Sequence, residues 1–191
     1  MSLKHAILGF LSLSPLSGYD LKKTFDRSVQ HFWPANQSQI YRTLAELDEQ
    51  GLVSKEVISR DERLDMKVYS LTEAGRVELH NWLVTPLRPQ DTREPFLIQL
   101  FFGGQLSEAE LLNLLQHQLR GVEEMLTVYT TFYEATSAYL QQNPATRDQF
   151  LQALTLEFGL KAQQVHQHWL QSTIERIQTG HYTLAALNSP F

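Results

Sequence analysis

Cysteine is absent from the 191 residues of the chain. This absence excludes disulfide bonds and thiol nucleophiles, and it removes most of the ligand sets that bind zinc. No apolar run approaches the ~20 residues that a helix needs to cross a bilayer. The N-terminal segment has no small-residue cleavage pattern of a signal peptide. We therefore expect a cytoplasmic protein that does not associate with membranes.

The sequence also lacks the motifs of the common enzyme classes. It contains no phosphate-binding loop, no nucleophile elbow and no paired-carboxylate motif. Its seven histidines show no convincing metal-ligand spacing. His166 and His168 are two positions apart and point to nearly opposite sides of a helix, so they cannot share an ion. We predict no enzymatic activity, no metal site and no cofactor.

A basic excess is missing as well, although such an excess is common in nucleic-acid-binding proteins. Sixteen basic and 21 acidic residues give a net charge of −5. The acidity is concentrated in residues 86–191, whereas residues 1–85 are nearly neutral. Because opposing charges are screened beyond ~8 Å at physiological salt, the N-terminal part can still bind phosphates if its cations cluster on one face.

What is present begins with two short helices. Residues 3–13 are mostly apolar and end before Pro15, which disfavours helix in the residue that precedes it. Ser17 and Asp20 have the spacing of a capping box, so a second helix should run from Ser17 to about Ser28. Tyr19, Leu21 and Phe25 are expected on its apolar side.

A third helix should begin at Asn36, because Asn36 and Gln39 form another capping box. The positions expected to face inward and outward follow from the helical period: Ile40, Leu44 and Leu47 inward, and Ser38, Arg42, Ala45 and Glu49 outward. Gly51 supplies a left-handed stop. Residues 52–58 and 66–71 are rich in strand-forming residues and flank the charged segment SRDERLD, which predicts a hairpin. Another helix opens at Thr72. The order helix, hairpin, helix is typical of small proteins that bind duplex DNA.

Residues 85–95 contain three prolines among polar residues, and we predict a linker there between domains at 1–84 and 96–191. Within the second domain, Ser107 and Glu110 cap a long helix that should end at Asn143 and Pro144. A last helix should span about 146–179. The first of these long helices carries apolar or aromatic residues at alternating spacings of three and four, the signature of a coiled coil: Leu112, Leu115, Leu119, Val122, Leu126, Tyr129 and Tyr133. This seam could pack within the chain or join two chains, and we predict that it forms the dimer interface, with these helices crossing between subunits.

Four segments resemble the PadR family of transcriptional regulators, specifically the members with a virulence-activator-like helical C-terminal domain. The segments are ILGFLSLSPLSGYDLKK, SQIYRTLAELDEQGLV, KVYSLTEAGR and EPFLIQLFFGG, in the order and spacing of the family. The resemblance implies a mainly α fold: an N-terminal winged helix-turn-helix domain, with three helices plus a two-stranded wing, and a C-terminal long-helix, coiled-coil-like dimerisation domain. It further implies a repressor of nearby genes that a small molecule releases. We therefore predict a C2 homodimer whose partner is a double-stranded DNA operator.

In such a protein the helix from Asn36 would enter the major groove with its N-terminus first. The residues best placed to meet DNA are Asn36, Gln37, Ser38, Tyr41 and Arg42 in the helix and Arg60, Arg63 and Lys67 in the wing. Many family members have proline where this chain has Arg42, so base preferences cannot be copied from relatives. Tyr41 could instead pack under the wing. The wing cations alternate with Asp61, Glu62 and Asp65, so the tip could equally be a solvated loop.

An effector site is the last prediction. Aromatic residues could line a pocket for an aromatic or phenolic small molecule, with Phe101, Phe102, Phe132 and Trp169 as the candidates. Aromatic side chains at helical spacing more often simply pack. The alternative to the whole functional interpretation is a winged-helix module that binds a protein and not DNA, which the net charge of −5 would favour.

Overall fold

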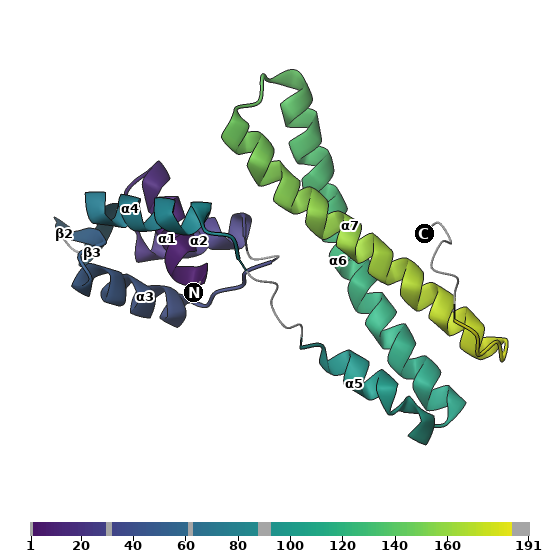
Figure 1. The fold of residues 1–191 in the computed structure, drawn as a ribbon. Helices are drawn as coiled ribbons and strands as arrows, with labels where there is room; N and C mark the ends of the chain where they lie inside the picture. Colours follow the sequence, from purple (N-terminus) through teal and green to yellow (C-terminus); the bar gives the residue numbers. More distant parts are fainter. Residues whose placement is uncertain (1, 30–31, 61–62, 88–92, 185–191) are drawn as a thin grey trace. The chain divides into compact units, whose positions relative to one another are not determined.

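The computed structural model describes residues 2–29, 32–60, 63–87 and 93–184. The chain divides into two compact units, residues 1–90 and 91–191. Figure 1 shows short helices with a small sheet in the first unit and long helices in the second.

The helices of the N-terminal unit, within its described residues, are α1 (Ser2–Leu13), α2 (Gly18–Arg27), α3 (Gln37–Glu49) and α4 (Glu73–Val84). Its sheet contains β1 (Leu16–Ser17), β2 (Val53–Arg60) and β3 (Arg63–Leu71), in the order β1-β3-β2 with antiparallel pairing. The expected winged helix-turn-helix fold is therefore confirmed. The strands of the wing extend further toward the charged tip than predicted, to Arg60 and from Arg63.

The two-residue strand β1 was not predicted from the sequence. It pairs Leu16 with Tyr69 and Ser17 with Val68. Two residues are too few to show an alternating pattern, and β1 becomes a strand only because β3 lies beside it. A third strand must therefore be added to the predicted two-stranded wing.

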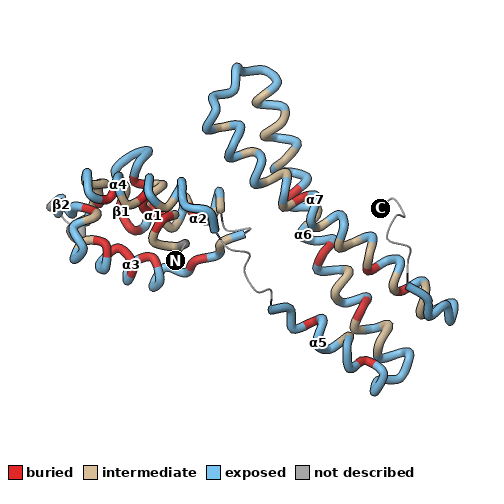
Figure 2. Tube along the Cα trace, in the orientation of Figure 1, coloured by how far each residue is buried: buried red, intermediate tan, exposed pale blue. Residues whose placement is uncertain are grey.

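The core of the N-terminal unit is formed by the inward faces of its helices and the base of the wing (Figure 2). Ile40, Leu44 and Leu47 of α3 are buried, as their phase predicted. Phe25 of α2 is also buried and meets Phe10 of α1 edge to face at 5.0 Å between ring centroids. This core leaves the opposite face of α3 in solvent.

Local signals account for the ends of most helices. Asn36 and Gln39 cap α3 reciprocally, with both hydrogen bonds at 2.9 Å. Gly51 has a φ of 67° and ends the turn after α3, in the left-handed region that glycine favours. Thr72 caps α4 by accepting a hydrogen bond from the Gly75 amide at 3.1 Å.

The C-terminal unit consists of α5 (Pro95–Phe101), a single 3-10 turn η1 (Gly103–Gln105), α6 (Glu108–Gln142) and α7 (Arg147–Gln178). The two long helices form an antiparallel hairpin (Figure 1). Its core contains Phe96 of α5, Leu115 and Val122 of α6, and Leu170 and Ile174 of α7. Within the described parts of the chain, no helix is long and apolar enough to cross a membrane.

Candidate nucleic-acid interface

The outer face of α3 presents a run of polar side chains at the N-terminal end of the helix. Gln37 and Ser38 are exposed in the first turn. Arg42 follows one turn later and is also exposed, with Glu46 at 4.0 Å as its ion-pair partner. A pair at this distance on an exposed helix face holds the guanidinium only weakly, so it is available to another anion.

Asn36 differs from its neighbours because its side-chain oxygen already has a partner. It accepts the Gln39 amide at 2.9 Å as the N-cap of α3. The side-chain NH₂ group is the donor of this residue, and the cap does not use it. The prediction that Asn36 meets DNA therefore concerns this nitrogen only.

Tyr41 lies against Gly18 of α2, and it is also near Tyr69 of β3 at the base of the wing. A Cβ atom built on Gly18 would lie 2.5 Å from Cε1 of the Tyr41 ring and 3.1 Å from its hydroxyl oxygen. The side chain is nonetheless 42% exposed. Burial raises the pKa of Tyr69 on β3, and the nearby Tyr41 contributes to this shift. One face of the ring is thus fixed by packing, while another side meets solvent.

The wing contributes Lys67, whose exposed side chain lies on β3 opposite Val57 of β2. Arg60 and Arg63 form the last register pair of the hairpin. Their side chains, and the tip residues 61 and 62, lie outside the described residues. Lys55 is not available in the same way, because Asp48 at the end of α3 holds its ammonium at 2.6 Å. This hydrogen bond and the Asp48 charge raise the pKa of Lys55.

One expectation for α2 was wrong: Tyr19 does not lie on its apolar side. The side chain is 56% exposed, and Lys23 places its ammonium 4.4 Å from the ring centroid. The buried positions are Gly18, Leu21 and Phe25, spaced three and four apart. Sequence analysis missed Tyr19 and Lys23 as candidate phosphate contacts. The only signal was the pair Lys22-Lys23 one turn into the helix.

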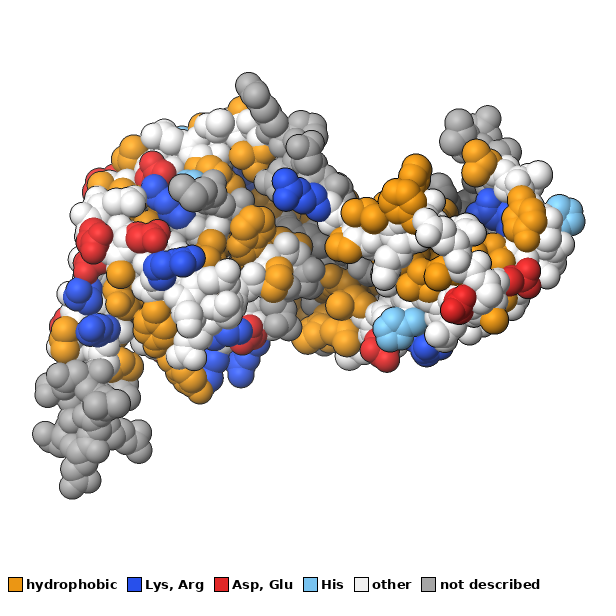
Figure 3. All heavy atoms as spheres, turned by 90° about the horizontal axis from the view of Figure 1, so that it is seen from below, with side chains coloured by type: hydrophobic (Ala, Val, Ile, Leu, Met, Phe, Trp, Pro, Cys, Tyr) orange, Lys and Arg blue, Asp and Glu red, His pale blue; other side chains and the backbone are white. Residues whose placement is uncertain are grey.

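The face that carries α3 is mixed in charge. In the view of Figure 3, Lys and Arg side chains on the N-terminal unit are interspersed with acidic and hydrophobic ones. Several cations of this unit are occupied locally, including Lys4 by Glu78 at 2.8 Å and Lys22 by Asp26. Attraction of a polyanion must therefore rely on a few individual cations.

The C-terminal unit corrects the interpretation of the coiled-coil seam. Leu115, Val122 and Tyr129 are buried within this single chain. The remaining four seam residues are half-buried: Leu112, Leu119, Leu126 and Tyr133. The three leucines pack against the same intrachain core. Tyr129 lies over Gly159 of α7, where an added Cβ would be 3.1 Å from Cε1. The seam joins α6 to α7, which is the intrachain alternative that the spacing left open.

The candidate effector residues do not gather in one place. Phe101 and Phe102 meet edge to face at 5.0 Å at the end of α5. Phe132 is exposed on α6, and Trp169 packs against Phe96 with their ring centroids 6.3 Å apart. A groove of about 540 Å³ between α6 and α7 has none of them in its lining, which is Glu123, Leu126, Thr127, Thr130, Thr131, Gln164 and Gln167.

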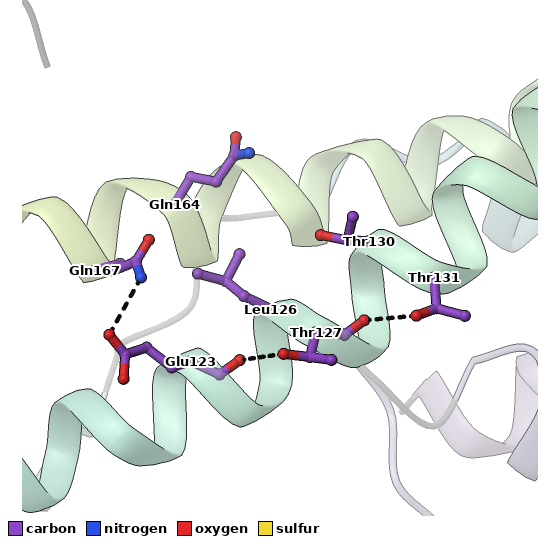
Figure 4. Close-up of a pocket in the computed structure, with 7 residues that line it drawn as sticks. All are labelled: Glu123, Leu126, Thr127, Thr130, Thr131, Gln164 and Gln167. Carbon is purple, nitrogen blue, oxygen red and sulfur yellow. Dashed lines mark hydrogen bonds between the residues drawn. The ribbon is translucent and has the colours of Figure 1, made fainter.

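The groove is lined by the side chains of one glutamate, two glutamines, three threonines and Leu126, as Figure 4 shows. Gln167 donates to Glu123 across it at 3.5 Å, and Thr127 and Thr131 donate to backbone carbonyls of their own helix. Among the residues that the structure describes, no three acidic or histidine side chains are placed to hold a metal ion.

Comparison with known proteins agrees with this architecture. Residues 7–81 match the model of the transcriptional regulator PadR-like family, and residues 92–178 match that of the virulence activator alpha C-terminal domain. The negative transcriptional regulator PadR of Bacillus subtilis is 32% identical over 177 residues, which span 92% of this chain and 97% of the relative.

Two solved structures of that relative are similar to this chain. The crystal structure of B. subtilis PadR in complex with operator DNA has a TM-score of 0.81 at 31% identity, covering 93% of this chain and 99% of the other. Its complex with p-coumaric acid has a TM-score of 0.76 at 31% identity, covering 92% and 95%. The family is one of transcriptional regulators and not of enzymes. The chain thus belongs to the PadR-like family of transcriptional regulators.

Proposed function

We propose that the protein is a dimeric, sequence-specific DNA-binding repressor that a small aromatic effector releases from its operator. The observation that carries this proposal is the solvent-exposed polar face of α3, which presents Gln37, Ser38 and Arg42. The B. subtilis relative was crystallised with operator DNA and is named a negative regulator. A repressor of genes would act in the cytoplasm, where bacterial DNA lies.

In this mechanism α3 enters the major groove. Gln37 has the amide that suits an adenine edge, and Arg42 can bind a guanine or a phosphate. Ser38 and Tyr41 are suited to phosphate oxygens, while the small Ala45 lets the helix approach closely. Lys67, with Arg60 and Arg63 nearer the wing tip, would contact phosphates beside the groove. Residues 1–84 would bind DNA, residues 85–95 would link, and residues 96–191 would dimerise and sense the effector.

Leu115, Val122 and Tyr129 of the predicted seam are buried within the chain, so a dimer would use side chains that this chain leaves exposed. Phe101, which is 82% exposed, and Phe158, which is 75% exposed, are examples in the C-terminal unit, and Figure 3 shows hydrophobic side chains on its surface. Large apolar side chains in solvent are candidates for an interface where they adjoin one another. Two copies would place their recognition helices on half-sites about 34 Å apart, which gives the specificity that one winged helix lacks.

Sedimentation velocity tests the dimer directly. We expect a dimer at micromolar concentration, and a monomer when Phe101→Asp and Phe158→Asp are combined. Gln171→Glu, on another side of α7, is the control and should stay dimeric. A monomeric wild type, or a double variant as dimeric as the wild type, would remove the support for this surface.

DNA binding is tested by fluorescence anisotropy with labelled duplexes from the region upstream of the protein's own gene, against shuffled duplexes of equal composition. We expect a specific complex that weakens as salt rises, because phosphate contacts release counterions. If no upstream duplex binds better than its shuffled control even at low salt, and a protein partner is retained in a pull-down, the protein-interaction alternative replaces this proposal.

The effector is proposed to be an aromatic or phenolic acid, because the B. subtilis relative was crystallised with p-coumaric acid. Titration of the protein–DNA complex with p-coumaric acid and related phenolic acids should lower its anisotropy. Tryptophan fluorescence of Trp169 should change in the same titration if the aromatic candidates Phe101, Phe102 and Phe132 contribute to the site. Acetate at equal concentration controls for ionic strength.

A further inference from the structure

We propose that Gly18 is a positioning residue for DNA binding. Because Gly18 has no side chain, the Tyr41 ring packs against it, and this packing directs the Tyr41 hydroxyl toward the DNA backbone. We call this space at Gly18 the seat of the ring. The inference rests on the DNA-binding function proposed above. It adds a residue that does not itself touch DNA and that no helix-phase argument identifies.

The seat arises from the buried stripe of α2. This stripe consists of Gly18, Leu21 and Phe25, so the first of its three positions has no side chain. Leu21 and Phe25 fill the core at their positions and are fully buried. At Gly18 the space is filled instead from α3, by Tyr41. An added Cβ would lie 2.5 Å from Cε1, 2.8 Å from Cζ and 3.1 Å from the hydroxyl oxygen of that ring.

The kind of atom that a Cβ would meet decides the outcome. All three nearest atoms belong to the outer end of the Tyr41 side chain, and none belongs to the backbone. A ring on two rotatable bonds can swing away, so an alanine here should leave the fold intact and displace the hydroxyl. The φ of Gly18 is not in the left-handed region, and alanine is favoured over glycine in a helix.

The position of the Tyr41 ring in the motif makes its orientation important for DNA binding. Tyr41 belongs to the first turns of α3, one residue before Arg42, and is 42% exposed. The edge of the ring that faces α2 includes the hydroxyl oxygen, so the hydroxyl lies where α2 meets α3. In helix-turn-helix proteins the first helix crosses the DNA backbone while the second enters the groove. A hydroxyl held at this junction is within reach of a phosphate.

A double-mutant cycle on the full chain tests the coupling. Gly18→Ala and Tyr41→Ala should each weaken binding to the upstream duplex about 10-fold, and the double variant should also lose about 10-fold and not about 100-fold, because both changes remove the same contact. The slope of log affinity against log salt should stay as in the wild type, because a neutral hydroxyl neutralises no phosphate and releases no counterion. Tyr41→Phe, which keeps the ring and removes the hydroxyl, should show the same loss of affinity, about 10-fold.

Gly9→Ala is the matched control, since glycine 9 lies within α1 and an added Cβ there meets nothing within 4 Å. It should bind DNA as the wild type does. Additive losses, an unchanged affinity for Gly18→Ala, or wild-type affinity for Tyr41→Phe would each overturn the inference while the wild type still bound DNA. Absence of specific binding by the wild type would instead overturn the proposed function, and the role of Gly18 in DNA binding with it.

The seat itself can be measured without DNA. In an NMR spectrum of the wild type, the ring current of Tyr41 should shift the Hα resonances of Gly18 relative to those in Tyr41→Leu. Tyr41→Phe should retain the shift. Equal Hα shifts in all three proteins would show that the ring does not lie on Gly18 and would overturn the inference.

Discussion

Gly75→Ala should lower the free energy of unfolding of the N-terminal unit more than substitutions on its surface do, because α4 touches the backbone of the turn after α3 at this residue. A Cβ on Gly75 would lie 2.0 Å from the carbonyl oxygen of Leu52, 3.0 Å from its carbonyl carbon and 2.7 Å from Cδ1 of Leu71. The Leu52 contact is with backbone, so no rotamer change relieves it. The helix must move away from the turn by more than an ångström.

The magnitude follows from what this movement breaks. Overpacking by one methyl group costs about 1–3 kcal/mol in the free energy of unfolding. The same junction contains the hydrogen bond from the Thr72 amide to the Leu52 carbonyl at 3.2 Å and that from the Thr72 hydroxyl to the Gly51 carbonyl at 2.8 Å. Losing one of them adds about 1 kcal/mol. The better helix propensity of alanine returns up to about 1 kcal/mol. Because the contact is with backbone and cannot be relieved by a rotamer change, the upper end of the overpacking range applies, and the three contributions give a net loss of about 3 kcal/mol.

Urea unfolding followed by tryptophan fluorescence measures this change. A Trp169→Phe background leaves Trp33 and Trp82 as the only tryptophans, so the signal reports the N-terminal unit alone. The midpoint temperature of thermal unfolding should fall by about 12 °C or more, since 1 kcal/mol of stability corresponds to about 4–8 °C in a unit of this size. Gly9→Ala should be neutral or slightly stabilising. A Gly75→Ala protein within about 1 kcal/mol of the wild type would refute the reasoning from backbone contact.

Three further predictions concern the same unit. Asn36→Ala should lower the free energy of unfolding by about 1 kcal/mol through loss of the α3 cap, and Asn36→Asp should restore most of it in urea titrations; equal stability of Asn36→Ala and the wild type would count against the cap. Arg42→Ala and Lys67→Ala should each reduce the salt slope of DNA binding by about 0.9, while Arg76→Ala on α4 leaves it unchanged; normal slopes for both would remove the phosphate contacts assigned to them. Hydrogen bonds from Lys4 and then His5 lower the pKa of Glu78, so its contribution to stability is present above its unfolded pKa of about 4.3 and is lost as the pH falls through the lower folded value. The urea midpoint of Glu78→Gln should therefore fall less steeply between pH 5 and about pH 3 than that of the wild type, and parallel curves would contradict this.

Much of the N-terminal unit follows from local physics and could be predicted from the sequence. A capping box needs only residues three positions apart, so the start of α3 at Asn36 was readable without tertiary information. The burial of Ile40 and Leu44 and the exposure of Ser38 follow from the helical period alone. These determine which face of α3 is offered to DNA.

What the sequence could not decide are the contacts between elements. A seam of period 3.5 on α6 must pack against another apolar surface, but the sequence does not show which one. In the structure it packs against α7 of the same chain. Tyr19 was assigned to the apolar side of α2 for its aromatic ring, although Tyr19 and Leu21 are two positions apart and face nearly opposite sides of a helix. The structure gives that stripe to Gly18, and Tyr41 fills the space there. The strand β1 exists only through pairing with β3.

The sequence by itself determined where the helices begin and end and which face of α3 is polar, because caps and helical period act between residues a few positions apart. Only the tertiary structure decided which chain fills the seam on α6 and where the Tyr41 ring rests. Those outcomes depend on shape complementarity between segments distant in the sequence, and no local pattern records which surface will meet which.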